Sequence, residues 1–87
     1  MKYMTTWNIS EDNWADAVAR FKDANPAPPK GVTMLGRWHA MGAGYGFALF
    51  DVDDPIAFTK FIMEWSDLVN QEVTPVVTDE EVGQALM

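Results

Sequence analysis

Cysteine is absent from this sequence of 87 residues. No disulfide can therefore staple the fold, and no thiolate is available as a nucleophile or as a metal ligand. A chain without cysteine suits a reducing compartment, so we expect a cytoplasmic protein. Residues 1–7 hold one lysine and lack the apolar stretch of a signal peptide. No apolar run approaches the roughly 18 residues that a membrane helix needs, so we expect a soluble protein.

Basic residues are also scarce. Six lysines and arginines stand against thirteen aspartates and glutamates, which gives a net charge of −7. Binding to nucleic acid or to an anionic membrane depends on clustered cations that neutralise phosphates. The cations here are spread along the chain, so we expect neither of these partners. Apolar residues make up 48% of the sequence, which is enough for one small domain over residues 1–87.

The first part of the sequence predicts a strand followed by a helix. Residues 2–9 are rich in aromatic and β-branched types, which favours a strand. Ser10 is the expected N-cap, and Trp14, four positions later, completes a hydrophobic staple across it. Apolar residues then recur at the i, i+3, i+4 and i+7 positions from Trp14, which indicates one helical face. The helix should stop near Ala24, because the proline-rich residues 25–29 cannot continue it.

A hairpin and a second helix are expected next. Residues 32–39 and 45–52 have the character of strands, and the glycine-containing turn 40–44 joins them. Asp54 caps the following helix, with a proline in its first position. Apolar residues continue at helical spacing as far as residue 69.

The last part of the sequence predicts an edge strand and a terminal helical turn. Residues 72–77 form the expected fourth strand. Pro75 lies inside this strand, and proline is tolerated in a sheet only at an edge or a bulge. Thr78 and Glu81 have the spacing of a capping box, which starts a short helix near the end of the chain.

This order of elements, βαββαβ, is that of a ferredoxin-like α+β domain. We predict a four-stranded antiparallel sheet with strand order 4-1-3-2 and two helices on one face. Residues 45–52 form the most apolar strand, as a central strand should be. The position of Pro75 in an edge strand agrees with the same order.

Both faces of the predicted sheet carry apolar side chains. In the third strand we expect Tyr45, Phe47 and Leu49 on one face, and Ala48, Phe50 and Val52 on the other. In the second strand we assign Val32, Met34 and Trp38 to one face, and Leu35, Arg37 and His39 to the other. Two helices can shield only one face, and a large exposed apolar face usually marks an interaction surface. We therefore expect a two-fold homodimer, in which a second copy covers the remaining face.

Several blocks of the sequence together resemble a family of small bacterial proteins of unknown function in the dimeric α/β-barrel superfamily. These blocks are Leu35-Gly36-Arg37-Trp38-His39, Asp53-Asp54-Pro55, Glu64-Trp65-Ser66-Asp67-Leu68 and Glu72-Val73-Thr74-Pro75-Val76. The resemblance implies two ferredoxin-like subunits packed sheet against sheet, with a pocket between sheet and helices in each subunit. The superfamily includes cofactor-free monooxygenases, lactone isomerases, haem enzymes and ligand-sensing domains. A haem would have to rest on His39 alone, so we expect no cofactor.

His39 and Arg37 are the candidate catalytic residues. His39 is the only histidine of the chain, and histidine is the usual acid–base group near neutral pH. Arg37 lies two residues earlier in the strand, so both side chains should project from the same face. A cation beside an imidazole could hold an anionic oxygen. Two structural roles compete with this one: His39 could simply end its strand, and Arg37 could pair with Glu72 or Asp67.

Aromatic residues supply candidate walls for a cavity. We predict that Trp38, Tyr45, Trp65 and Trp7 hold a flat ligand, since indole and phenol groups offer a broad apolar face and one polar atom. Trp14 is instead interpreted as part of the core, because the staple accounts for it. The glycine-rich residues 42–46 lead into a strand rather than a helix, so they are not a phosphate loop.

No metal site is expected, because the sequence has no cluster of histidines and no calcium-loop spacing. Three functions stay open at this point. The first is a homodimeric small-molecule-binding domain that acts as a cofactor-free, monooxygenase- or isomerase-like enzyme on a flat acidic organic compound. The second is a non-catalytic module that senses a ligand or binds a partner. The third is a structural homo-oligomer whose interior is filled by its own side chains.

Overall fold

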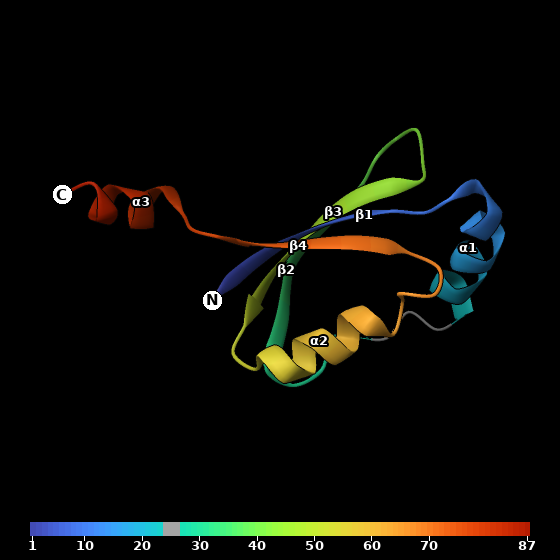
Figure 1. The fold of residues 1–87 in the computed structure, drawn as a ribbon, viewed down its shortest axis with the longest axis horizontal. Helices are drawn as coiled ribbons and strands as arrows, with labels where there is room; N and C mark the ends of the chain where they lie inside the picture. The colour runs from blue at the N-terminus through green and yellow to red at the C-terminus, as the bar shows by residue number, and fades with distance from the viewer. Residues whose placement is uncertain (24–26) are drawn as a thin grey trace.

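The computed structural model describes residues 1–23 and 27–87, and its elements follow the predicted order (Figure 1). They are β1 (Lys2–Asn8), the 3-10 turn η1 (Glu11–Asn13), α1 (Trp14–Asp23), β2 (Val32–His39), β3 (Tyr45–Val52), α2 (Pro55–Met63), β4 (Asn70–Val76) and α3 (Asp79–Ala85). The expected end of the first helix near Ala24 lies outside the described residues. Within the described part of the chain, no helix is both long and apolar enough to span a membrane.

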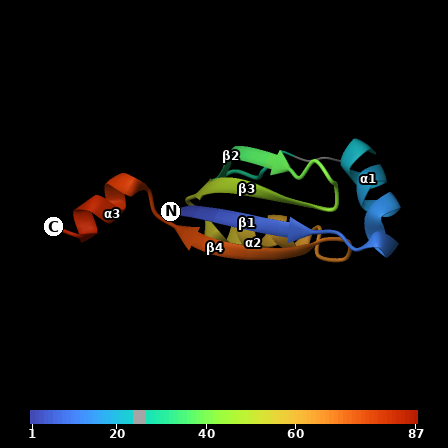
Figure 2. The same cartoon turned by 90° about the horizontal axis from the view of Figure 1, so that it is seen from above.

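The four strands form one antiparallel sheet in the order β2-β3-β1-β4. This is the predicted 4-1-3-2 order, so the ferredoxin-like α+β fold class is confirmed. The apolar strand β3 is central, and β4, which contains Pro75, is at an edge. Figure 2 shows α2 behind the sheet and α1 beyond one end of it.

Local sequence explains where the helices begin and end. Asp54 caps α2 by accepting hydrogen bonds from the backbone N–H groups of Ile56 and Ala57, at 3.0 and 3.1 Å. The helix ends at Met63 rather than near residue 69, although turns continue beyond it, with the Val69 N–H donating to the Trp65 carbonyl at 2.8 Å. Ser10 precedes a 3-10 turn and makes no side-chain capping bond, so the predicted cap at this position is wrong in detail.

The strand register defines two faces of the sheet. Tyr3, Thr5 and Trp7 of β1 pair with Phe50, Ala48 and Gly46 of β3, and these residues point toward the helices. We call this side the covered face. The alternate residues form the open face, on which no helix of the described chain packs. Leu49, Phe47 and Tyr45 lie there, and Phe47 and Tyr45 are exposed.

A β-bulge between Met34 and Gly36 changes the faces of β2. Beyond it, Arg37 pairs with Ala48 and His39 pairs with Gly46, so Arg37 and His39 share the covered face with Met34. The extra residue of a bulge shifts the alternation of side chains by one position. The prediction that Arg37 and His39 share a face is confirmed, but their assignment opposite Val32 and Met34 is wrong.

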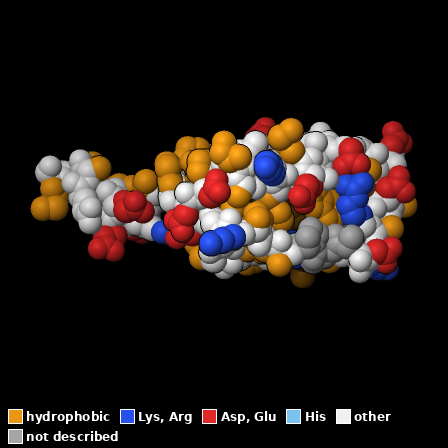
Figure 3. Space-filling model, turned by 90° about the horizontal axis from the view of Figure 1, so that it is seen from below, with side chains coloured by type: hydrophobic (Ala, Val, Ile, Leu, Met, Phe, Trp, Pro, Cys, Tyr) orange, Lys and Arg blue, Asp and Glu red, His pale blue; other side chains and the backbone are white. Residues whose placement is uncertain are grey.

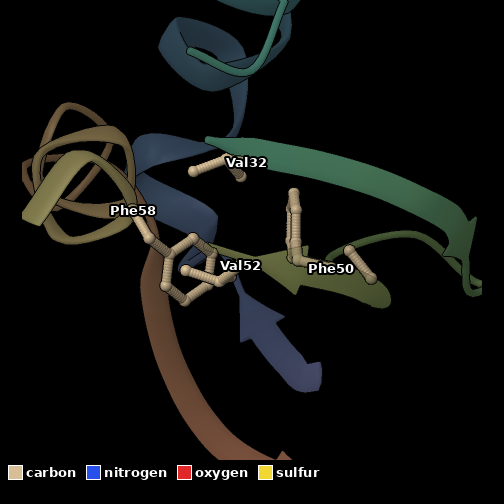
Figure 4. Close-up of a cluster of buried hydrophobic side chains, with 5 residues drawn as sticks. Val32, Phe50, Val52 and Phe58 are labelled. Carbon is tan, nitrogen blue, oxygen red and sulfur yellow. The ribbon is translucent and has the colours of Figure 1, made fainter. Parts of the chain in front are cut away.

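The buried core lies under one end of the covered face. Figure 4 shows Val32, Phe50, Val52 and Phe58 converging between the sheet and α2. The rings of Phe50 and Phe58 are 5.2 Å apart at a tilt of 55°, within the range of favourable aromatic pairs. At this end of the domain, side chains fill the space between the two layers.

Candidate ligand-binding cavity

The other end of the covered face is hollow. A cavity of about 410 Å³ lies between the sheet, α1 and α2 and opens to solvent. Its volume is within the range of small-molecule sites. Figure 3 views the molecule from the side of α2 and shows apolar atoms reaching the surface between charged groups. The floor of the cavity includes Thr5 and Ala48, which are nearly inaccessible.

Small side chains on the sheet make this space. On the covered face of β3, Ala48 lies at the hollow end, whereas Phe50 and Val52 lie at the filled end; Gly46 is covered by the Trp7 ring. The single buried residue of α1 is Ala17, whereas Trp14 and Phe21 on the same helical face are 41% and 38% exposed. The apolar stripe of α1 therefore borders the cavity instead of packing on the sheet.

His39 stands between two aromatic rings on the cavity wall. Its ring is 5.2 Å from that of Trp7 and 5.8 Å from that of Phe21, with edge-to-face angles of 71° and 80°. Such contacts orient an imidazole without using its nitrogen atoms. Across residues 1–23 and 27–87, no hydrogen bond to the His39 side chain is present, which leaves the nitrogen atoms available to a ligand.

Arg37 lies beside His39 and is held by an aromatic ring instead of a carboxylate. Its guanidinium carbon is 4.9 Å from the centre of the Phe21 ring, a cation–π contact. No carboxylate of the described residues pairs with it. The expected pairing with Asp67 or Glu72 is wrong: Asp67 binds Arg20, and Glu72 lies on the open face opposite Thr6.

The charge of the cavity is opposite to that of the protein. Its lining includes two cations, Lys22 and Arg37, together with His39, and the described lining residues include no aspartate or glutamate. In a chain with thirteen acidic residues and six basic ones, this is a local excess of positive charge. Low-dielectric walls concentrate the field of such groups, which favours a negatively charged ligand.

An ion pair between α1 and the turn after α2 holds the outer wall. Arg20 donates two hydrogen bonds to the Asp67 carboxylate, at 2.8 and 2.7 Å, and one to the Glu64 carbonyl at 3.3 Å. Its guanidinium also lies 5.4 Å from the Trp65 ring centre. The hydrogen bonds from Arg20 lower the pKa of Asp67, and the bonds to Asp67 raise the pKa of Arg20. This bidentate pair links α1 to the turn after α2 on the outer side of the cavity.

Comparison with known proteins places this architecture in a family. A family model described as a domain of unknown function, DUF3303, matches residues 1–87. The chain belongs to the DUF3303 family. A search of curated proteins finds no match. The family assignment therefore carries no activity with it, and the geometry of the cavity is the basis for a function.

The structure brings together most of the residues predicted for a site in this DUF3303 domain. His39, Arg37, Trp7 and Trp65 border the cavity, and Tyr45 also touches it, although the Tyr45 ring packs beside Phe47 of the open face. Trp38 does not: it lies on the open face, paired with Phe47 and 55% exposed. Strand alternation points Trp38 away from Arg37 and His39, and the bulge in β2 makes its side the open face.

Sequence reasoning missed two walls of the cavity in the DUF3303 domain. The staple pattern assigns Trp14 to the core, and Phe21, seven positions later, falls on the same helical face. Both line the cavity. Their helical spacing is the same whether a stripe packs or borders a hollow, so the pattern alone could not distinguish these cases.

Proposed function

We propose that this DUF3303 domain is a homodimer that binds a flat, anionic organic molecule in the cavity of each subunit. The observation that carries the proposal is the combination of aromatic walls with two cations and no described carboxylate. Aromatic faces favour a planar apolar body, and the cations favour a carboxylate, enolate or phenolate oxygen. An open cavity supports a ligand-binding function over a structural oligomer with a filled interior.

The same residues support a catalytic version of this function. His39 serves as the acid–base group, and Arg37 stabilises negative charge that develops on the ligand during proton transfer. The reaction is then cofactor-free and monooxygenase- or isomerase-like. The second candidate is a ligand-sensing module, which uses the same cavity without turnover. The position of His39 on the cavity wall beside Arg37 supports the catalytic version.

The open face supports the dimeric part of the proposal. Trp38, Tyr45, Phe47 and Leu35 are all exposed on or beside it. A contiguous apolar surface of this kind is uncommon on monomers and usually marks a contact. Two copies related by a two-fold axis would bury the same face on each chain.

Calorimetric titration with 2-naphthoate and its neutral analogue 2-naphthamide tests the binding site. We expect 2-naphthoate to bind at least about tenfold more tightly, which is about 1.4 kcal/mol. Arg37→Gln should remove this preference, whereas Lys60→Gln, an exposed lysine on α2, should preserve it. Equal binding of the two compounds, or an unchanged preference in Arg37→Gln, would contradict the proposal.

Native mass spectrometry of protein purified from its own cells identifies the natural ligand and the oligomeric state together. With that compound, His39→Ala separates the two versions of the function. Loss of turnover with retained binding supports the enzyme. Binding without turnover in the wild-type protein supports the sensing module.

A further inference from the structure

The C-terminal segment, residues 77–87, is not packed against any helix or strand of residues 1–23 and 27–76. We call it the arm. Every one of its residues is exposed, and Figures 1 and 2 show α3 projecting beyond the end of the sheet. The chain extends 49 Å along its longest axis and has a radius of gyration of 14.4 Å, against about 12 Å for a compact domain of this length.

The arm is nevertheless a specified helix. Thr78 and Glu81 form a complete capping box, with the Glu81 N–H donating to the Thr78 hydroxyl at 3.2 Å and the Thr78 N–H donating to the Glu81 carboxylate at 3.0 Å. These bonds lower the pKa of Glu81. A helix of seven residues is marginal in water, and short helices gain their stability by packing an apolar face.

That apolar face is present and unoccupied. Val82, Ala85 and Leu86 follow the i, i+3, i+4 spacing of one helical side. Val82 is 42% exposed and Leu86 is 82% exposed. Figure 3 shows the apolar atoms at the tip of the arm, with acidic groups nearer its root. A short helix that has both a complete cap and an apolar side is expected to pack that side against another surface.

The composition of the open face indicates what that contact is. By the strand register, β1 and β4 contribute Lys2, Thr6 and Glu72 to this face, whereas the exposed aromatic residues Trp38 and Phe47 lie on β2 and β3. A stable dimer buries about 800 Å² per partner around an apolar centre. A second copy stacked on this face therefore finds few apolar contacts near the β4 edge, and an apolar helix at that edge would supply them.

The arm starts at the rim of this face. Val76, the last residue of β4, pairs with Lys2 on the open side of the sheet. Because the arm leaves the sheet at this edge, it can reach a second copy of the protein that is stacked on the open face. Under two-fold symmetry, both copies would supply an arm and receive one.

We propose that the arm packs its Val82–Leu86 side against the second copy of this chain, so that each arm completes the interface of the other subunit. This inference rests on the homodimer of the proposed function. The acidic side chains of Asp79, Glu80 and Glu81 stay in solvent at the first turn.

Sedimentation velocity over a dilution series of the full-length chain tests this contact. We expect Leu86→Asp to weaken the dimer at least about tenfold. Gln84→Asp is the matched control, because it adds the same charge on the opposite side of the same helix and should change the dissociation constant less than twofold. Circular dichroism of each variant checks that the domain stays folded, which is expected because Leu86 is 82% exposed.

The outcomes separate the two proposals. A wild-type dimer with an unchanged constant in Leu86→Asp overturns the role of the arm and leaves the stacked dimer standing. A wild-type chain that is monomeric at all concentrations overturns both. Hydrogen exchange gives a second measurement: amides of α3 should be protected at high protein concentration and exchange freely on dilution, and exchange that is fast at every concentration contradicts the arm contact.

Discussion

The two ends of the covered face differ in what separates the sheet from the helices. At one end Phe50, Val52 and Phe58 fill the gap, and at the other Ala48 borders a cavity of about 410 Å³. Both ends belong to the same strands, so strand order does not decide between them. The volumes of a few side chains decide which end is filled, together with the position of α1, which does not pack on the sheet. Stability and ligand binding are therefore expected to reside at opposite ends of one face.

Truncation at the filled end should have the largest effect. Phe58 is 5% exposed and contacts the rings of Phe50 and Tyr3. Phe58→Ala is expected to lower the free energy of unfolding by about 3–5 kcal/mol, because it removes buried area and leaves a cavity. Urea denaturation measures this change. Ile56→Ala is the control on the same helix, since Ile56 is 67% exposed, and it should cost no more than about 0.5 kcal/mol. Similar losses for both variants would show that the core is not where the structure places it.

Enlarging one residue at each end of the covered face tests whether one end is filled and the other hollow. Val52→Phe inserts a ring into filled space and should destabilise the domain by about 1–3 kcal/mol. Ala48→Phe places the same ring in the hollow, so it should cost less than Val52→Phe while abolishing 2-naphthoate binding. Denaturation and calorimetry on the same two proteins give both quantities. If Ala48→Phe binds 2-naphthoate as the wild type does, the ligand does not occupy this cavity.

Most of the fold could be predicted from periodicity and turn chemistry. Pro75 identified an edge strand, Asp54 and Pro55 marked the start of α2, and Thr78 with Glu81 marked the start of α3; all three are confirmed. Each of these signals acts over a few residues, so a linear pattern is sufficient to reveal it.

The hollow and the composition of its walls could not be predicted in the same way. The bulge in β2 moved Trp38 to the open face and Arg37 and His39 to the covered face. Gly36 was the available signal, since an isolated glycine inside a strand often marks a bulge. Residues of all four strands and of both α1 and α2 line the cavity, so no single stretch of sequence encodes its size.

The smallest expected effect is the loss of stability at acidic pH that comes from the ion pair between Arg20 and Asp67. The pKa of Asp67 is lowered in the folded protein, chiefly by its hydrogen bonds from Arg20. Because the pKa of Asp67 is lower in the folded than in the unfolded protein, the ionised carboxylate stabilises the fold at pH values above the ordinary aspartate range. This stabilisation is lost as the pH falls below about 4. Both side chains are accessible to solvent, so the change should be modest.

Thermal unfolding between pH 6 and pH 3 measures this loss. Asp67→Asn should be less stable than the wild type at pH 6, and its stability should fall less steeply toward pH 3. Asp16→Asn is the control, because Asp16 lies one turn before Arg20 in α1 but does not form its ion pair. It should keep the acid dependence of the wild type. Parallel curves for Asp67→Asn and the wild type would show that the pair does not secure the hollow end, and that other contacts of this region, such as the hydrogen bond from Arg20 to the Glu64 carbonyl, hold α1 there.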